Sequence, residues 1–210
     1  QLAEPRRGGR FGLGSLGTAV AGNPGILALI EHHALLYQDL ADPVRLLRSG
    51  SASGLGDYWA YARSGNPAAL PEAAIRPYTE LMAASQTLVA GEVLDSYNFA
   101  RHRCLLDVGG GNGTFLIAAA RRHPHLQLQL FDLPAVAACA ATHLAGAGLA
   151  ARSTCTGGDF CRDPLPPGAD LLTLVRVLHD HDDASVQRIL AGAYRALPAG
   201  GVLVIAEPMA

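Results

Sequence analysis

The pattern of apolar and polar positions changes close to residue 100. Before that point, apolar residues recur at helical spacing over residues 25–47, with a turn expected at 39–43, and again over 70–97. Residues 49–57 are rich in Gly and Ser, which predicts a loop. The first half of the chain is therefore predicted to be mainly helical.

After residue 100, short apolar runs alternate with helix-like segments. Strands are predicted at 104–108, 126–131, 152–156, 171–178 and 202–206, and helices at 114–123, 134–144 and 184–197. Nearly continuous apolar strands separated by helices indicate a parallel sheet with helices on both faces. The second half is therefore predicted to be a doubly wound α/β sheet, which binds ligands beyond the carboxyl ends of its strands.

The first 24 residues are rich in Gly and Arg, and large and small residues alternate over 10–17. This alternation predicts a hairpin or the remnant of a strand. The chain is accordingly divided into three regions: 1–24, a helical region 25–99, and an α/β domain 100–210. A length of 210 residues is compatible with one or two domains.

Composition narrows the function classes. Half of the residues are apolar and the net charge is only −2, which argues against disorder and against a nucleic-acid partner. All 16 basic residues are Arg, so a Walker-A loop and a lysine Schiff base are excluded. The four Cys show no C-x-x-C spacing, and no signal peptide or transmembrane run is apparent. We expect free thiols in a reducing cytoplasm.

A glycine-rich loop follows the first predicted strand of the sheet and opens a helix. Its spacing is acidic-x-G-x-G-x-G, formed by Asp107, Gly109, Gly111 and Gly113, whereas a dinucleotide fingerprint would need Gly where Thr114 stands. A carboxylate at this place repels a pyrophosphate but suits a cationic ligand. S-adenosylmethionine, which carries an ammonium and a sulfonium, fits this requirement.

Two more acidic residues follow the next two predicted strands. Asp132 can accept both ribose hydroxyls, and the alternative is a helix cap. Asp159 can accept the adenine amino group while Phe160 packs on the ring, and the alternative is a simple turn.

The segment after the fourth predicted strand contains His179, at the end of a buried strand, where it can act as a general base. A metal site with His181, Asp182 and Asp183 is the alternative, although the two Asp can instead cap the next helix. Glu207 ends the last strand, where it can orient the His or simply face solvent.

Five stretches together resemble the S-adenosylmethionine-dependent O-methyltransferases of the caffeate and acetylserotonin type. They are residues 105–113, 131–134, 158–160 and 176–180, and Glu207. The resemblance implies a class I methyltransferase sheet of Rossmann-like architecture, here truncated at its C-terminal end. It also implies homodimerisation through an amino-terminal winged-helix domain, of which residues 1–24 would be the remnant, and a role in dimerisation and substrate binding for the helical region 25–99.

The resemblance also assigns roles to individual residues. It implies cofactor contacts at Asp132, Leu133, Asp159, Phe160 and Arg176, His179 as the base, and Glu207 as a flanking acid; no metal is expected. The family more often has Trp at position 181 and often Lys at position 175, where this chain has His and Val.

Within the family, the chain looks most like the bacterial carotenoid branch, whose substrates are the tertiary 1-hydroxyls of acyclic carotenoids (hydroxyneurosporene, demethylspheroidene). The stretches that carry this resemblance are residues 23–25, 32–37, 82–86 and 175–182. We expect Trp59, Tyr61 and Met82 to contact this lipophilic substrate. Such a substrate is compatible with a cytoplasmic protein peripheral to the photosynthetic inner membrane. The alternatives are a methyltransferase of phenolic or polyketide hydroxyls, and a cofactor-binding or dimerisation module without activity.

Overall fold

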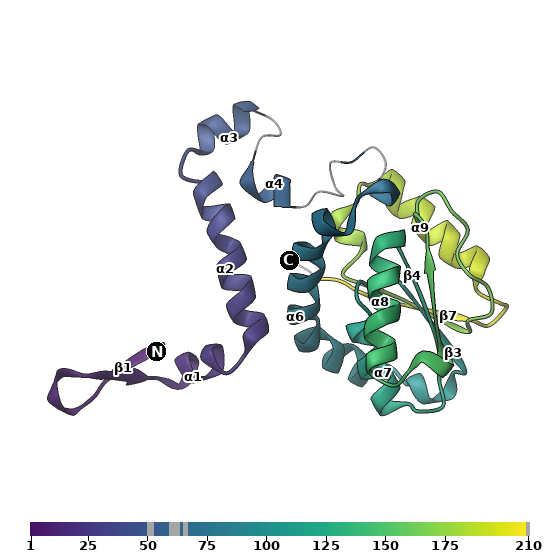
Figure 1. Ribbon diagram of the computed structural model, residues 1–210, viewed down its shortest axis with the longest axis horizontal. Helices are drawn as coiled ribbons and strands as arrows, with labels where there is room; N and C mark the ends of the chain where they lie inside the picture. Colours follow the sequence, from purple (N-terminus) through teal and green to yellow (C-terminus); the bar gives the residue numbers. More distant parts are fainter. Residues whose placement is uncertain (50–52, 59–63, 65–66, 209–210) are drawn as a thin grey trace. The chain divides into compact units, whose positions relative to one another are not determined.

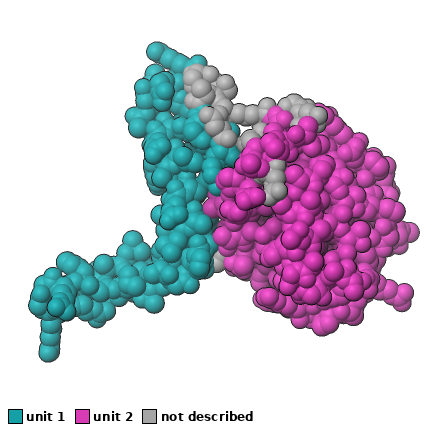
Figure 2. All heavy atoms as spheres, viewed as in Figure 1, with its two compact units in different colours: residues 1–58 teal, residues 59–210 magenta. Residues whose placement is uncertain are grey.

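The structure, a computed structural model, describes residues 1–49, 53–58, 64 and 67–208 (Figure 1). The chain forms two compact units, Gln1–Tyr58 and Trp59–Ala210 (Figure 2). None of the helices described is both long enough and apolar enough to cross a membrane.

The first unit contains a hairpin and short helices. Strands β1 (Ala3–Pro5) and β2 (Phe11–Leu13) pair antiparallel around the 3-10 turn η1 (Arg7–Gly9). Helices α1 (Ser15–Ala21), α2 (Pro24–Asp39), α3 (Pro43–Ser49) and α4 (Gly54–Tyr58) follow. The predicted hairpin is present, but residues 15–17 belong to α1. The winged-helix assignment of residues 1–24 stays a prediction.

The predicted loop at 49–57 is wrong for its second half, which forms α4. The carboxylate of Asp39 accepts hydrogen bonds from the amides of Gly54 (2.8 Å) and Leu55 (2.9 Å). These are first-turn N–H groups, which have no partner within a helix. A side chain 15 residues earlier in the chain thus stabilises the start of α4, which local Gly and Ser content does not reveal.

The second unit is an α/β domain. After η2 (Pro67–Ala69), α6 (Glu72–Ser96) and η3 (Phe99–Arg101), it contains strands β3 (Cys104–Val108), β4 (Gln127–Asp132), β5 (Ser153–Gly157), β6 (Leu171–Val175) and β7 (Val202–Ala206). The connecting elements are α7 (Thr114–Arg122), α8 (Pro134–Gly146), η4 (Ala150–Arg152), η5 (Leu178–Asp180) and α9 (Asp183–Ala196). The five strands are parallel, in the order β5-β4-β3-β6-β7, which confirms the predicted fold class.

The central strands β3 and β6 are buried on both faces because their side chains alternate between two apolar clusters. Leu105 packs with Phe115 and Ala140 from α7 and α8. Leu106 packs on the opposite face with Ile189 from α9. Since β4 and β5 lie on one side of β3 while β6 and β7 lie on the other, the topology switches direction between β3 and β6. In open α/β sheets, that switch point is where ligands bind.

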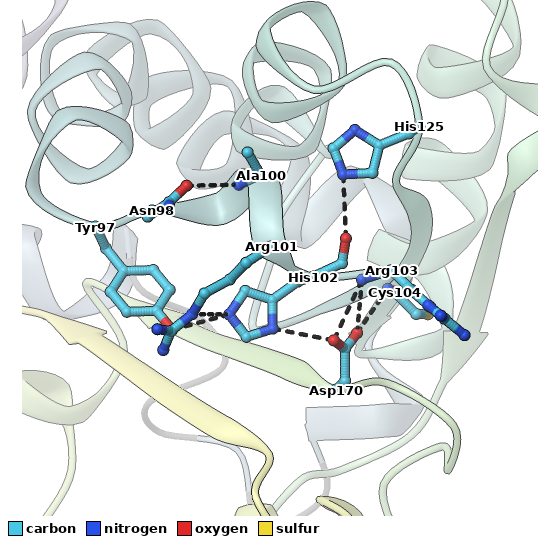
Figure 3. Close-up of polar contacts among 9 residues, drawn as sticks. All are labelled: Tyr97, Asn98, Ala100, Arg101, His102, Arg103, Cys104, His125 and Asp170. Atoms are coloured by element: carbon cyan, nitrogen blue, oxygen red, sulfur yellow. Dashed lines mark hydrogen bonds and ion pairs between the residues drawn. The ribbon is translucent and has the colours of Figure 1, made fainter.

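A polar network joins the amino ends of the central strands β3 and β6 (Figure 3). It lies at the end of the sheet opposite the switch-point loops. Asp170 accepts hydrogen bonds from the amide of Cys104 (2.7 Å) and from Nδ1 of His102 (3.0 Å). Nε2 of His102 lies 2.8 Å from the hydroxyl of Tyr97, which also accepts from Arg101. The network therefore fastens the end of α6 to two central strands.

Strand β6 is shorter than predicted, so the expectation that His179 ends a buried strand is wrong. The strand stops at Val175, because Arg176 adopts a left-handed conformation with φ 60°. The amides of Val177 and Leu178 then bond to the carboxylate of Glu207 instead of a neighbouring strand. His179 consequently lies on the 3-10 turn η5.

Candidate active site

A cavity of about 490 Å³ lies at the carboxyl ends of β3, β4 and β6, with α6 as one wall. The predicted site residues that line it are Met82, Asp107, Gly109, Gly111, Asp132, Leu133, Asp159, Phe160 and Arg176. Gly113, His179 and Glu207 lie next to this wall without forming part of it, whereas Asp180 and His181 do line it. Trp59 and Tyr61 lie outside the described residues.

The glycine loop presents its backbone to the cavity. Gly109, Gly111 and Gly113 all have positive φ, at 71°, 58° and 84°, a region that side chains with a Cβ rarely adopt. A Cβ at Gly109 would also lie 2.7 Å from a methyl group of Val177. The loop therefore needs glycine both for its conformation and for close approach to the segment after β6.

Asp132 lies beneath the glycine loop. One carboxylate oxygen accepts from the amide of Gly111 (2.8 Å) and the other from the amide of Leu133 (2.7 Å). Burial raises the pKa of Asp132 to about 6, although these two amide hydrogen bonds act in the opposite direction. Each carboxylate oxygen can accept a second hydrogen bond. Asp132 thus keeps acceptor capacity toward the cavity.

Asp107 is the second carboxyl group on this wall, and it is only 2% exposed. The hydroxyl of Thr173 on the neighbouring strand donates to it at 2.6 Å. Burial raises the pKa of Asp107 to about 7; the Thr173 hydrogen bond lowers it, and the charge of Asp132 raises it further. A cation in the cavity would stabilise the ionised form of both groups.

Asp159 and Phe160 follow β5. The carboxylate of Asp159 accepts from the amide of Cys161 (2.9 Å) and lies 3.4 Å from Nε of Arg162, so the residue also supports its own turn. The ring of Phe160 meets the ring of His181 edge to face, with 5.4 Å between centroids. The two rings form an aromatic corner of the cavity.

Arg176 connects the end of β6 to α6. Its guanidinium donates to Oγ of Ser85 (2.8 Å), Oε1 of Gln86 (3.4 Å) and Sδ of Met82 (3.0 Å). All three acceptors are neutral, so the positive charge persists beside the cavity. Ser85 and Gln86 are not among the predicted site residues, although their spacing from Met82 places the three residues on one helix face.

His179 and Glu207 form a hydrogen-bonded pair. Nδ1 of His179 lies 2.6 Å from one carboxylate oxygen of Glu207, whose other oxygen accepts the amides of Val177 (2.9 Å) and Leu178 (2.7 Å). Because a carboxylate only accepts, the geometry assigns a proton to Nδ1. Nε2 is then the nitrogen that can take up a proton. It lies 3.4 Å from a carboxylate oxygen of Asp180.

The acidic residues after His179 favour the capping interpretation. Asp182 precedes α9 and accepts the amide of Ser185 at 2.7 Å, a hydrogen bond that lowers the pKa of Asp182. In the part of the chain that the structure describes, no group of three or more His, Cys, Asp or Glu side chains is arranged to hold a metal ion.

Comparison with known proteins gives consistent matches. The model of the O-methyltransferase domain family matches residues 37–210. The chain is 46% identical over 209 residues to demethylspheroidene O-methyltransferase of Cereibacter sphaeroides, and the match covers 100% of this chain and 55% of that protein. The chain thus spans about half the length of the curated relatives it matches.

Solved structures agree with this result. LaPhzM superimposes with a TM-score of 0.73 at 30% identity, covering 97% of this chain and 61% of that one. The O-methyltransferase NcsB1 from neocarzinostatin biosynthesis, solved with S-adenosylmethionine and 2-hydroxy-5-methyl naphthoic acid, gives 0.68 at 26% identity, covering 97% and 63%.

Proposed function

The chain belongs to the O-methyltransferase domain family, and from this premise we propose that it binds S-adenosylmethionine and serves methyl transfer to a hydroxyl group of a small lipophilic molecule. The observation that carries the proposal is the convergence at one end of the sheet. A glycine loop and two buried carboxyl groups line the cavity at the switch point, and a histidine hydrogen-bonded to Glu207 lies next to that cavity.

The cavity wall suits the parts of this cofactor. The remaining lone pairs of Asp132 can accept the ribose hydroxyls, and Phe160 with Asp159 can receive the adenine. Asp107 favours the cationic end of the molecule, and the guanidinium of Arg176 is complementary to the carboxylate of the amino-acid tail. Gly109 and Gly111 allow the backbone to approach it closely.

In this proposal His179 is the general base. When bound, the cofactor supplies a methyl group made electrophilic by the sulfonium. Nε2 of His179 accepts the proton of the substrate hydroxyl while the oxygen forms its bond to the methyl carbon and the carbon–sulfur bond breaks. Glu207 fixes the tautomer and stabilises the imidazolium that forms. No step requires a metal ion.

For the substrate, we propose the tertiary 1-hydroxyl of an acyclic carotenoid. The support is the 46% identity to demethylspheroidene O-methyltransferase along the whole chain. The α6 wall agrees with an apolar substrate, since it presents Ile75, Tyr78 and Met82 to the cavity. The expected contacts of Trp59 and Tyr61 remain part of this proposal.

We further propose that the protein works as a homodimer in the cytoplasm, in contact with the membrane that holds its substrate. The first unit exposes large apolar side chains on α2 and α3, among them Leu27, Ile30, Tyr37 and Leu47. A second copy would remove such surface from water. The amino-terminal region 1–24 would take part as the winged-helix remnant.

Binding and product analysis test the proposal. Calorimetry with S-adenosylhomocysteine should show stoichiometric binding, and incubation with S-adenosylmethionine should raise the mass of a 1-hydroxylated acyclic carotenoid by one CH₂ unit. Methylation of a phenolic naphthoate but not of the carotenoid would show that the substrate is a phenol, which is the alternative stated above. Binding without turnover on either substrate class would support the inactive module, and the absence of binding would refute the cofactor assignment.

A further inference from the structure

The glycine loop is held from its outer side by a residue of α8. Nδ1 of His143 lies 2.9 Å from the carbonyl oxygen of Asn112, which is 31 residues earlier in the chain. Asn112 itself lines the cavity. One residue of the loop thus meets the cavity on one side and α8 on the other.

The loop depends on such external contacts because its three positive-φ glycines give it little conformational preference of its own. Its inner side is fixed where the amide of Gly111 bonds to Asp132 and the amide of Gly109 to the carbonyl of Phe131 (2.8 Å). The side-chain oxygen Oδ1 of Asn112 accepts hydrogen bonds from the amide and the hydroxyl of Thr114 at the start of α7. His143 holds the main-chain carbonyl of the same residue.

His143 stands on a rigid base. The next residue, Leu144, is fully buried, and a Cβ at Gly113 would lie 3.2 Å from its Cγ. Two consecutive residues of α8 therefore contact the loop, one through packing and one through a hydrogen bond. Because the carbonyl only accepts, Nδ1 of His143 donates, and both the neutral Nδ1–H form and the imidazolium can do so.

We infer that His143 is a positioning residue for the cofactor loop: by fixing the Asn112 carbonyl, it orients the peptide between Asn112 and Gly113 and holds the loop in its binding conformation. The amide of Gly113 bonds to the carbonyl of Gly110 at 3.0 Å, so this peptide is fixed at both ends. The inference rests on the proposed function, since the loop is taken to cradle S-adenosylmethionine. His143 is exposed and does not itself line the cavity, so it acts through its hydrogen bond to Asn112 of the loop.

Three variants test this role. His143→Phe keeps a ring but removes the donor, whereas His143→Asn places an N–H at the same number of bonds from the backbone. Thr142→Val is the matched control, because the hydroxyl of Thr142 bonds only within α8, to the carbonyl of Ala138 (3.2 Å). The readouts are the affinity for S-adenosylhomocysteine by calorimetry, hydrogen exchange of the amides at 109–113, and the melting temperature without ligand.

We expect His143→Phe to weaken the affinity about 3- to 10-fold, the range of one net hydrogen bond, with faster exchange in the loop and an unchanged melting temperature. His143→Asn and Thr142→Val should stay within about twofold of the wild type. Unchanged affinity and exchange in His143→Phe would overturn the inference, as would His143→Asn behaving like His143→Phe. If the wild type binds no cofactor, the proposed function fails, while faster exchange in His143→Phe would still support the positioning role.

Discussion

Glu207, at the end of β7, holds His179, on the turn after β6, through a hydrogen bond of 2.6 Å between its carboxylate and Nδ1. The same carboxylate accepts the amides of Val177 and Leu178. The Glu207 side chain therefore fixes the backbone of the turn and also selects the tautomer of His179, which lies on that turn. The pair has the geometry of a base and its orienting acid.

Glu207→Gln should lower kcat roughly 10-fold, with little change in the affinity for S-adenosylhomocysteine. The amide oxygen can still accept the two backbone N–H groups, but the negative charge that stabilises the imidazolium is lost. The double variant with His179→Ala should turn over hardly slower than His179→Ala alone, because the two residues act as a unit. Independent, multiplicative losses in single-turnover assays would contradict this pairing.

Asp132→Ala should weaken binding of S-adenosylhomocysteine by well over tenfold. Hydrogen bonds to a charged acceptor contribute about 1.5–3 kcal/mol each, and two ribose hydroxyls would lose theirs. Asp95→Ala serves as a control, since that exposed carboxylate pairs with Arg122 and does not line the cavity. Calorimetry measures the affinities for S-adenosylhomocysteine. Equal affinities for the wild type and Asp132→Ala would contradict the assignment of Asp132 to the ribose hydroxyls.

Cofactor affinity should rise with pH between about 5 and 8. Burial raises the pKa of Asp132 to about 6 and that of Asp107 to about 7, and both groups must be ionised to accept ribose hydroxyls or attract a cation. The free energy of unfolding without cofactor should change in the opposite direction. These two groups should lower it as the pH rises, because the folded state binds more protons than the unfolded state in this range. We expect roughly a tenfold gain in affinity across the interval. Asp132→Asn should flatten the profile, and an affinity independent of pH in the wild type would count against both carboxyl roles.

Asp170→Ala should lower the free energy of unfolding by roughly 1–3 kcal/mol, because the amides of Arg103 and Cys104 and Nδ1 of His102 lose their acceptor. Burial alone would raise the pKa of Asp170, but these hydrogen bonds lower it. Its contribution is therefore complete above the ordinary carboxyl pKa and declines as the pH falls through the lowered value. Asp95→Ala, at an exposed ion pair with Arg122, should change little. Urea titrations compare the two, and equal effects would contradict the role given to the network in Figure 3.

The sheet could be predicted because each strand is a short apolar run next to an amphipathic helix. The end of β6 could not, since residues 171–178 are apolar almost throughout. What stops that strand is tertiary: Arg176 turns into the left-handed region while bonding to α6, and Glu207 takes the following amides. The pattern of apolar residues within a strand does not predict hydrogen-bond partners that lie about 30 or 90 residues away in the sequence.

Residues of the cavity wall could be predicted where they belong to a sequence motif, as Asp107, Asp132 and Phe160 do. His143 could not be predicted from the sequence because it lies on the exposed face of a helix, outside any motif. Its role depends on a hydrogen bond to one main-chain carbonyl oxygen. Residues that act through the backbone of others leave no spacing signature in a single sequence.

Turnover of His179→Ala is the most direct test of the proposed base. Purified wild type and variant are compared for methyl transfer from S-adenosylmethionine to a 1-hydroxylated acyclic carotenoid, with binding of S-adenosylhomocysteine measured in parallel. We expect the variant to be slower by roughly 10²–10⁴-fold while its affinity stays within about twofold of the wild type. Near-normal turnover by His179→Ala would contradict the assignment of this histidine as the base.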